Sequence, residues 1–116
     1  MEKSKTLSYD TIATPLHILI EACRRGEPKA QFRIYKMYYR AMYNISLGIV
    51  KDPDEAEDIM QESFLSAFEK IGSWKGEVSF GAWLKSIVQN RSVDSWRKIG
   101  WQLKVATIKS PEQAGL

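Results

Sequence analysis

The sequence predicts an all-α fold, a compact three-helix bundle preceded by a short additional helix. Four segments carry apolar residues at spacings of three and four, the repeat of an amphipathic helix. Residues that favour helix starts precede them, and glycine stands where two of them end. With 116 residues, 44% of them apolar, the chain suits one domain. We therefore expect a helical domain at 15–99, an N-terminal tail at 1–14 and a linker or C-terminal tail at 100–116.

The first expected helix is short and begins at Pro15, with Thr14 as its cap. Gly26 is predicted to end it. His17 has no cluster of metal-binding residues around it in the sequence, so we interpret it as a surface residue. Cys23 is the single cysteine, which excludes an internal disulfide and fits a reducing cytoplasm. The apolar stripe of this helix consists of Leu16, Leu19, Ile20 and Cys23.

A longer helix is expected over residues 28–50. Four tyrosines at 35, 38, 39 and 43 are interleaved with Arg33, Lys36 and Arg40. Such a pattern can stack on nucleic-acid bases, but core and bundle-edge packing of the tyrosines is the favoured interpretation. The predicted inward stripe is Ala30, Ile34, Met37, Tyr38, Ala41, Ile45 and Ile49.

The third helix, predicted from Asp52 to about Ile71, has the clearest start. Asp52 is a good N-cap, Pro53 suits the first helical position, and Glu55 completes a capping box. The apolar face consists of Ala56, Ile59, Met60, Phe64, Ala67, Phe68 and Ile71. A second face, formed by Glu55, Asp58, Glu62 and Glu69 with Gln61 and Leu65 beside them, is acidic.

This acidic face is unusual in a basic chain. Residues 52–69 contain seven acidic residues and no basic one, whereas residues 70–109 carry a net charge of +6. A solvated helix surface is one interpretation. The other is a chain that contacts a basic protein with one surface and a polyanion with another.

The segment after this helix, residues 72–83, is predicted to be an irregular loop because it holds three glycines and two serines. Its large aromatic residues, Trp74, Phe80 and Trp83, must either anchor the loop to the core or meet a ligand. With Lys75 between them, they suit a pocket for a flipped base, and a docked structural loop is the equal alternative. We expect Trp83 to be mainly structural.

The last helix is predicted from Phe80 to Ile99, with Ser79 as its cap and Gly100 as its end. Its apolar face should hold Phe80, Trp83, Leu84, Ile87, Val88 and Trp96. Its outward side is basic, with Asn and Gln among Arg and Lys, a chemistry that holds phosphates and reads base edges. Trp101, Leu103 and Val105 alternate, which indicates an extended segment, and Ser110-Pro111 marks a tail.

In this order, the motifs AEDIMQESFLSAFEKI, W-K-G, SFGAWL and IVQNRSVDSWRK resemble region 2 of a sigma-70 family transcription initiation factor. They are most similar to the extracytoplasmic-function (ECF) group. The resemblance covers residues 16–99. It implies a bacterial, cytoplasmic domain that binds core RNA polymerase and promoter DNA, with an anti-sigma factor as a further partner.

The resemblance also implies roles for individual residues. Asp58, Gln61, Glu62 and Leu65 would contact the clamp helices of the beta-prime subunit of polymerase. The loop and the last helix would recognise and help to melt the −10 element through its non-template strand. The DNA-binding residues implied are Phe64, Trp74, Lys75, Gly76, Ser79, Phe80, Asn90, Arg91, Arg97 and Lys98.

The chain departs from the family in one respect, because residues 100–116 cannot build the helix-turn-helix module of region 4. We therefore expect a fragment of a longer factor or a truncated product. A protein-interaction module that binds polymerase or an anti-sigma factor without reading DNA is the alternative function. An enzyme is not expected, because the sequence lacks metal-ligand spacing and a phosphate-cradling glycine motif, and it implies no cofactor, no metal and no membrane segment.

Overall fold

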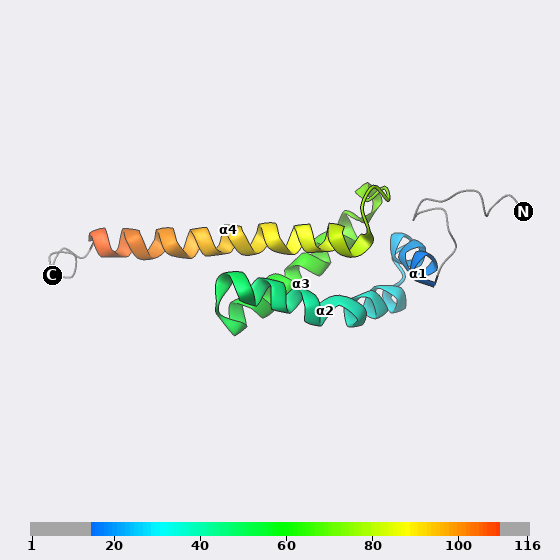
Figure 1. Cartoon of the computed structure of the whole chain (residues 1–116), viewed down its shortest axis with the longest axis horizontal. Helices are drawn as coiled ribbons and strands as arrows, with labels where there is room; N and C mark the ends of the chain where they lie inside the picture. The colour runs from blue at the N-terminus through cyan, green and yellow to red at the C-terminus, as the bar shows by residue number, and fades with distance from the viewer. Residues whose placement is uncertain (1–14, 110–116) are drawn as a thin grey trace, which may run out of the picture.

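The computed structural model describes residues 15–109, which form an all-α structure (Figure 1). The elements in order are α1 (Pro15–Arg24), α2 (Pro28–Val50), α3 (Pro53–Glu69), the short 3-10 turn η2 (Ile71–Ser73) and α4 (Phe80–Lys109). No strand occurs within this range. The predicted all-α class with a short N-terminal helix is confirmed. The expected tail at 1–14, with the Thr14 cap, and residues 110–116 of the expected C-terminal tail at 100–116 lie outside the described residues.

The helix starts follow local chemistry. The Asp52 Oδ1 atom accepts a 3.0 Å hydrogen bond from the Asp54 N–H, and Pro53 occupies the first position of α3. Ser79 Oγ accepts a 3.2 Å bond from the Ala82 N–H at the start of α4. These two caps are the predicted ones, and each satisfies a backbone donor that the helix itself cannot pair.

Two residues with positive φ reverse the chain between helices. Gly26 (φ 78°) ends α1, and its N–H donates to the Cys23 carbonyl at 2.9 Å. Lys51 (φ 62°) caps α2 and donates to the Leu47 carbonyl at 2.9 Å. The tight turn at Lys51 leads directly into the Asp52 cap, so α2 and α3 run antiparallel.

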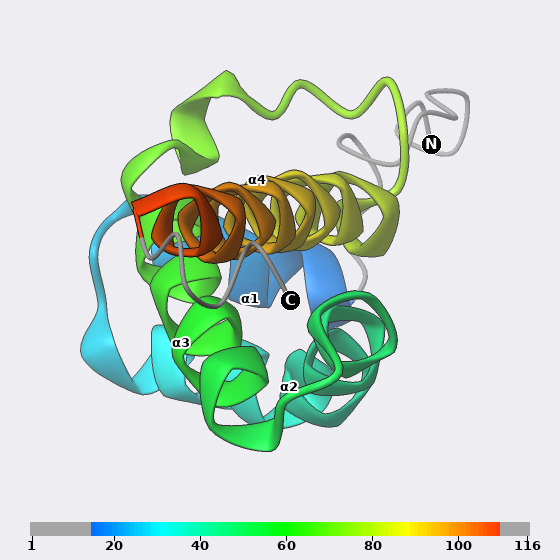
Figure 2. The ribbon, with the colours of Figure 1, turned by 90° about the vertical axis from the view of Figure 1, so that its left-hand side faces the viewer.

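The helices α2 and α3 lie side by side, and α4 packs across both of them (Figure 2). The loop between η2 and α4 passes along the side of α4 that faces away from α2 (Figures 1 and 2). The short helix α1 packs at the N-terminal end of α2 and also contacts η2. This arrangement leaves one face of α3 and most of the loop exposed to solvent.

The core lies where α2, α3 and α4 meet. Ile34, Leu84 and Val88 are completely buried. Two buried serines, Ser46 on α2 and Ser92 on α4, share a 2.8 Å hydrogen bond. Their small side chains let the two helix backbones approach each other closely.

The predicted inward stripe of α2 is partly wrong. Met37 and Ala41 are exposed, whereas Met42 and Ser46 are buried. Ala30, Ile34 and Tyr38 continue to Met42 and Ser46 in steps of four, because the partner helices follow the i+4 ridge. A buried serine is invisible to a search for apolar spacing.

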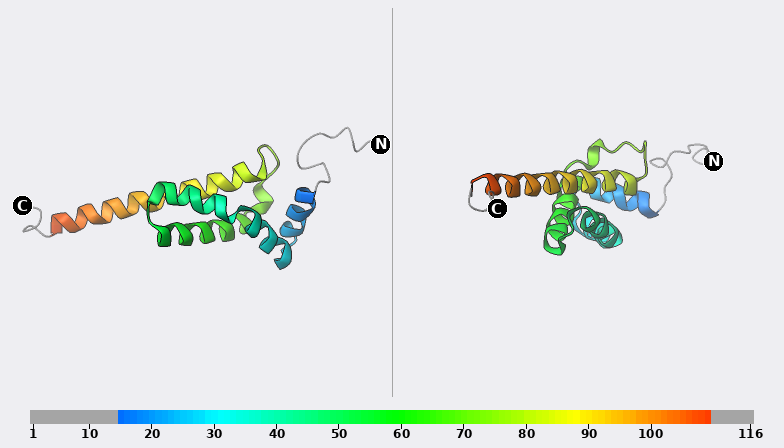
Figure 3. Two further views of the ribbon diagram at one scale, coloured as in Figure 1. Left: turned by 60° about the horizontal axis from the view of Figure 1, so that its bottom comes forward. Right: turned by 60° about the vertical axis from the view of Figure 1, so that its left-hand side comes forward.

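The predicted end of the last helix at Ile99 is also wrong, because α4 runs through Gly100 to Lys109. The expected extended segment with Trp101, Leu103 and Val105 is therefore helical. Gly100 does not take the positive φ of a helix-ending glycine, and in a helix interior it costs only about 1 kcal/mol relative to alanine. The part of α4 from Trp96 to Lys109, here called the overhang, projects beyond α2 and α3 (Figure 3).

Candidate functional site

The acidic face of α3 is open to solvent. Asp58, Gln61, Glu62 and Leu65 are all exposed, and the Leu65 side chain has 66% of its surface accessible. The opposite face of α3 supplies Ala56, Ile59, Met60 and Phe64 to the core. The sequence pattern therefore places these four residues together correctly. An exposed leucine among carboxylates is typical of a surface that another protein covers.

Two acidic residues at the edge of this face turn towards α4. Glu62 Oε1 lies 3.6 Å from Arg91 Nη1, and both side chains are largely exposed. Glu55, expected to complete the capping box, instead accepts a 2.6 Å hydrogen bond from Ser95 Oγ. Asp58, Gln61 and Leu65 thus remain the outward part of the face, with Gln61 Nε2 donating to Glu57 Oε2 at 3.4 Å.

A surface groove of about 560 Å³ runs where α3 and α4 meet. Glu55 and Glu62 line one wall, and Asn90, Arg91 and Lys98 line the other. Three of the predicted DNA-binding residues therefore lie close to the acidic face. The ion pair across the groove is exposed and contributes little to stability.

Two aromatic residues of the predicted loop segment, Trp74 and Phe80, lie in the core beside Phe64 of α3. Phe64, Trp74 and Phe80 are 3%, 4% and 2% exposed. The rings of Trp74 and Phe80 meet edge to face with centroids 5.7 Å apart, and Trp74 Nε1 donates a 2.9 Å bond to the Val78 carbonyl. In this conformation, the rings anchor the loop to the core, as the docked-loop alternative predicts. They offer no open surface on which a base could stack.

The loop backbone and its polar residues remain accessible. Lys75 and Ser79 are exposed, and Gly76 between them has a φ of 83°, which a residue with a Cβ rarely adopts. Val78 is 49% exposed. The loop is therefore docked on the core through Trp74 and exposes Lys75 and Ser79 to solvent.

Trp83, predicted to be mainly structural, is partly buried and packs against the core. Trp74, whose role the sequence left open, is buried more deeply and is nearly inaccessible. Trp96, placed on the apolar face by its spacing, is 57% exposed because the bundle ends beside Ser92 and Ser95. Asn90, Arg91, Arg97 and Lys98 are exposed as predicted.

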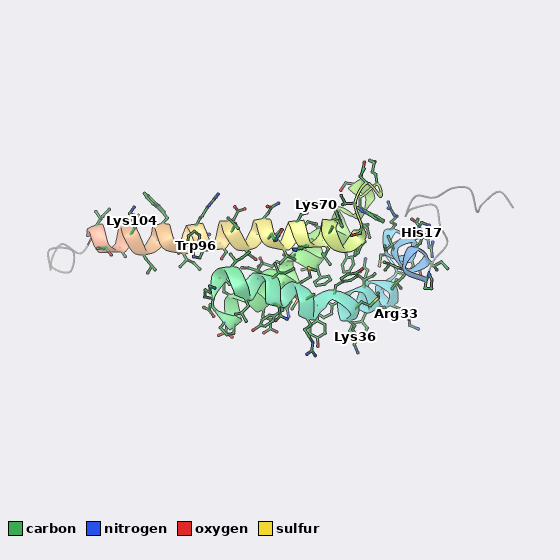
Figure 4. All side chains as sticks on the ribbon, in the orientation of Figure 1. His17, Arg33, Lys36, Lys70, Trp96 and Lys104 are labelled. Atoms are coloured by element: carbon green, nitrogen blue, oxygen red, sulfur yellow. The ribbon has the colours of Figure 1, made fainter. Side chains whose placement is uncertain are left out.

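The tyrosines of α2 are mainly structural. Tyr35 meets Phe64 edge to face at 4.9 Å and stacks with Tyr39 at 5.6 Å, while Tyr38 packs 5.7 Å from Phe80. Arg33 and Lys36 point away from the bundle (Figure 4). Core packing, the favoured interpretation, accounts for Tyr35 and Tyr38.

Arg24 is the contact residue of the loop that sequence reasoning missed. It joins α1 to Trp74, fifty positions away, and nothing in the local pattern indicates that pairing.

Among residues 15–109, no group of three or more His, Cys, Asp or Glu side chains could hold a metal ion. No helix in this range is long and apolar enough to span a bilayer. His17, expected at the surface, is partly buried.

Residues 34–102 match the family model described as Sigma-70 region 2. The ECF RNA polymerase sigma factor BldN of Streptomyces coelicolor is 34% identical over 91 residues, which are 77% of this chain and 34% of that protein. SigW, an ECF RNA polymerase sigma factor of Bacillus subtilis, is 32% identical over 79 residues, 68% of this chain and 42% of SigW. The chain thus spans less than half the length of these relatives. No solved structure matches it significantly.

Proposed function

The chain belongs to the sigma-70 region 2 family, in its ECF group, and from this we propose that it is a transcription initiation factor domain. It would bind core RNA polymerase through α3, and promoter DNA through the loop and α4, in the bacterial cytoplasm. The observation that supports the proposal is that one bundle presents two adjacent exposed surfaces of opposite charge, an acidic one on α3 and a basic one on α4. The acidic face of α3 is solvent-exposed around Leu65, and the basic residues line the neighbouring helix.

The polymerase contact is proposed for Asp58, Gln61, Glu62 and Leu65, with the beta-prime clamp helices as partner. Carboxylates around an exposed leucine suit a basic partner with an apolar spot at its centre. None of the four side chains belongs to the buried core. These side chains therefore contribute little to the stability of the fold and are available to bind a partner.

The experiment compares the double variant Gln61→Ala/Glu62→Ala with Asp94→Ala, an exposed acid on α4. Thermal stability should change by no more than about 1 kcal/mol in both, as expected for exposed positions. Binding to core polymerase should fall sharply in the double variant and stay near wild type in Asp94→Ala. Wild-type binding by the double variant would refute the assignment.

The DNA contact is proposed for the −10 element, with melting helped by capture of a non-template base. Asn90, Arg91, Arg97 and Lys98 are available for phosphates and base edges. Of the predicted DNA-binding residues in the loop, Lys75 and Ser79 are exposed and Gly76 is partly buried. Because Phe64, Trp74 and Phe80 are buried, base stacking on them requires the loop to open first.

An interaction module that binds polymerase or an anti-sigma factor without reading DNA is the second candidate, and the buried loop aromatics favour it. Single-stranded −10-like oligonucleotides separate the two functions. DNA binding predicts an affinity that falls steeply with salt and falls further in Arg91→Ala. If the protein does not bind these oligonucleotides even at low salt, the interaction module is the function that remains.

A further inference from the structure

We infer that the overhang of α4 carries a second binding site, for single-stranded DNA, in a hollow between Trp96 and Trp101. The hollow shares Arg97 with the proposed −10 contacts, but its two tryptophans are not among those contacts. The inference depends on the proposed function only for the choice of DNA. It starts from the fact that almost the whole surface of the overhang is accessible. Trp96 and Trp101 are 57% and 63% exposed, although tryptophan is usually placed against other residues.

The geometry of the hollow comes from helix spacing. Residues 96 and 101 are five positions apart, so their indoles stand on either side of a strip of the helix that holds Gly100, Arg97 and Lys104. The hollow between them is lined by these five residues and by Leu103 and Thr107. A Cβ built at Gly100 meets nothing within 4 Å, so the floor of the hollow is open.

The positive charge of the overhang favours an anionic ligand. Residues 96–109 contain Arg97, Lys98, Lys104 and Lys109 and no acidic residue. Cations that flank accessible indoles provide the two parts of a single-strand site, phosphate pairing and a stacking surface for bases. Arg97 and Lys104 share the hollow with the two indoles, which a simple solvated helix surface does not require.

The hollow is also continuous with the basic face of the bundle. Asn90, Arg97 and Lys104 follow one another at intervals of seven, so they form a line along α4 about 21 Å long. Trp96 and Lys104 both lie on the projecting part of the helix (Figure 4). A strand held beside Asn90 can therefore continue along the helix into the hollow.

A membrane surface fits the overhang less well. An interfacial helix keeps its apolar residues on one face and its cations on the other. Here Ile99 and Leu103 lie on one side, Trp101 and Ile108 on nearly the opposite side, and cations lie between them. A second copy of the chain is disfavoured as well, because two overhangs carry charge of the same sign.

The test measures binding of a fluorescein-labelled 15-nucleotide oligo(dT) by anisotropy at two salt concentrations. Trp96→Ala/Trp101→Ala should lower the affinity about tenfold or more, the range for loss of base stacking. The control is Ile99→Ala, which removes an exposed apolar residue of the same overhang that does not line the hollow, and it should change affinity less than twofold. Gly100→Leu should raise helix content by circular dichroism while lowering affinity, because its side chain fills the hollow.

Equal losses in the tryptophan double variant and in Ile99→Ala, or no loss in either, would overturn the inference. Binding to anionic phosphatidylglycerol vesicles that depends on the tryptophans, with oligo(dT) affinity unchanged, would overturn it in favour of a membrane. Arg91→Ala separates this site from the proposed function. Loss in Arg91→Ala without loss in the tryptophan variant supports only the −10 contact, and the converse supports only the hollow.

Discussion

The guanidinium of Arg24 on α1 lies over the indole of Trp74 in the loop, 5.5 Å from the ring centroid. Arg24 Nη2 also donates a 3.0 Å hydrogen bond to the Trp74 backbone carbonyl. A second pairing, between Arg24 Nε and Glu21 Oε2 at 3.1 Å, orients the guanidinium. The short first helix therefore fixes the conformation of a loop that begins almost fifty residues later.

Arg24→Ala should loosen the loop without unfolding the bundle. A cation–π contact and a charged hydrogen bond at this partly buried position together suggest a loss of about 2 kcal/mol. Hydrogen exchange of residues 72–79 should accelerate more than exchange in α2. Arg25→Ala, which removes an exposed arginine paired with Glu27, is the control. Unchanged exchange in the loop would show that α1 does not hold it.

Trp74→Ala should destabilise the protein more than Trp83→Ala. The Trp74 side chain is buried and hydrogen-bonded, so its truncation should cost about 3–5 kcal/mol. Trp83 is partly exposed at the first turn of α4 and should cost clearly less. Urea melts of both variants measure the difference. Equal losses would contradict the ranking that burial gives.

The helix starts could be predicted because their causes are local. Pro53 with its Asp52 cap, and Ser79 before α4, act within one turn of the residue they precede. The end of α4 could not be predicted in this way. Gly100 ends a helix only if it adopts a positive φ, and the helix-favouring residues on both sides outweigh its modest cost.

For the candidate site too, features that depend on one helix could be predicted, and contacts between helices could not. The exposure of Asp58, Gln61 and Leu65 follows from the apolar face on the other side of α3. The contact of Glu62 with Arg91, and that of Glu55 with Ser95, depend on which helices lie side by side. Periodicity describes one helix at a time, so it carries no signal for such pairs.

The buried pair Ser46–Ser92 should show energetic coupling between α2 and α4. Either serine changed to alanine should cost about 1 kcal/mol, the net value of a typical hydrogen bond. The double variant should cost less than the two single losses combined, because the partner is no longer left unpaired. Ser92→Leu should cost more than Ser92→Ala, since it forces the helix backbones apart. Additive single losses in urea melts would show that the hydroxyls act independently.

Cys23 should be unreactive in the folded protein. Burial, and secondarily the negative charge of Glu27, raise the pKa of the Cys23 thiol from 9.0 to about 11. The side chain is 1% exposed, so a disulfide reagent at pH 8 meets neither an accessible sulfur nor a thiolate. Labelling should be complete in urea and far slower in buffer. Rapid labelling in buffer would show that α1 opens readily.

The same thiol should make stability depend on pH in alkaline solution. A pKa that is higher in the folded state than in the unfolded state gives a stabilising contribution that is complete below about pH 9. This contribution is lost as the pH rises through about 11, and a shift of about two units corresponds to roughly 2–3 kcal/mol. Burial also raises the pKa of Tyr38, which acts in the same direction. Cys23→Ala separates the two, because the variant retains only the tyrosine contribution. Urea melts at pH 8, 9 and 10 should therefore converge for wild type and Cys23→Ala as the pH rises, and parallel curves would exclude the thiol as the cause.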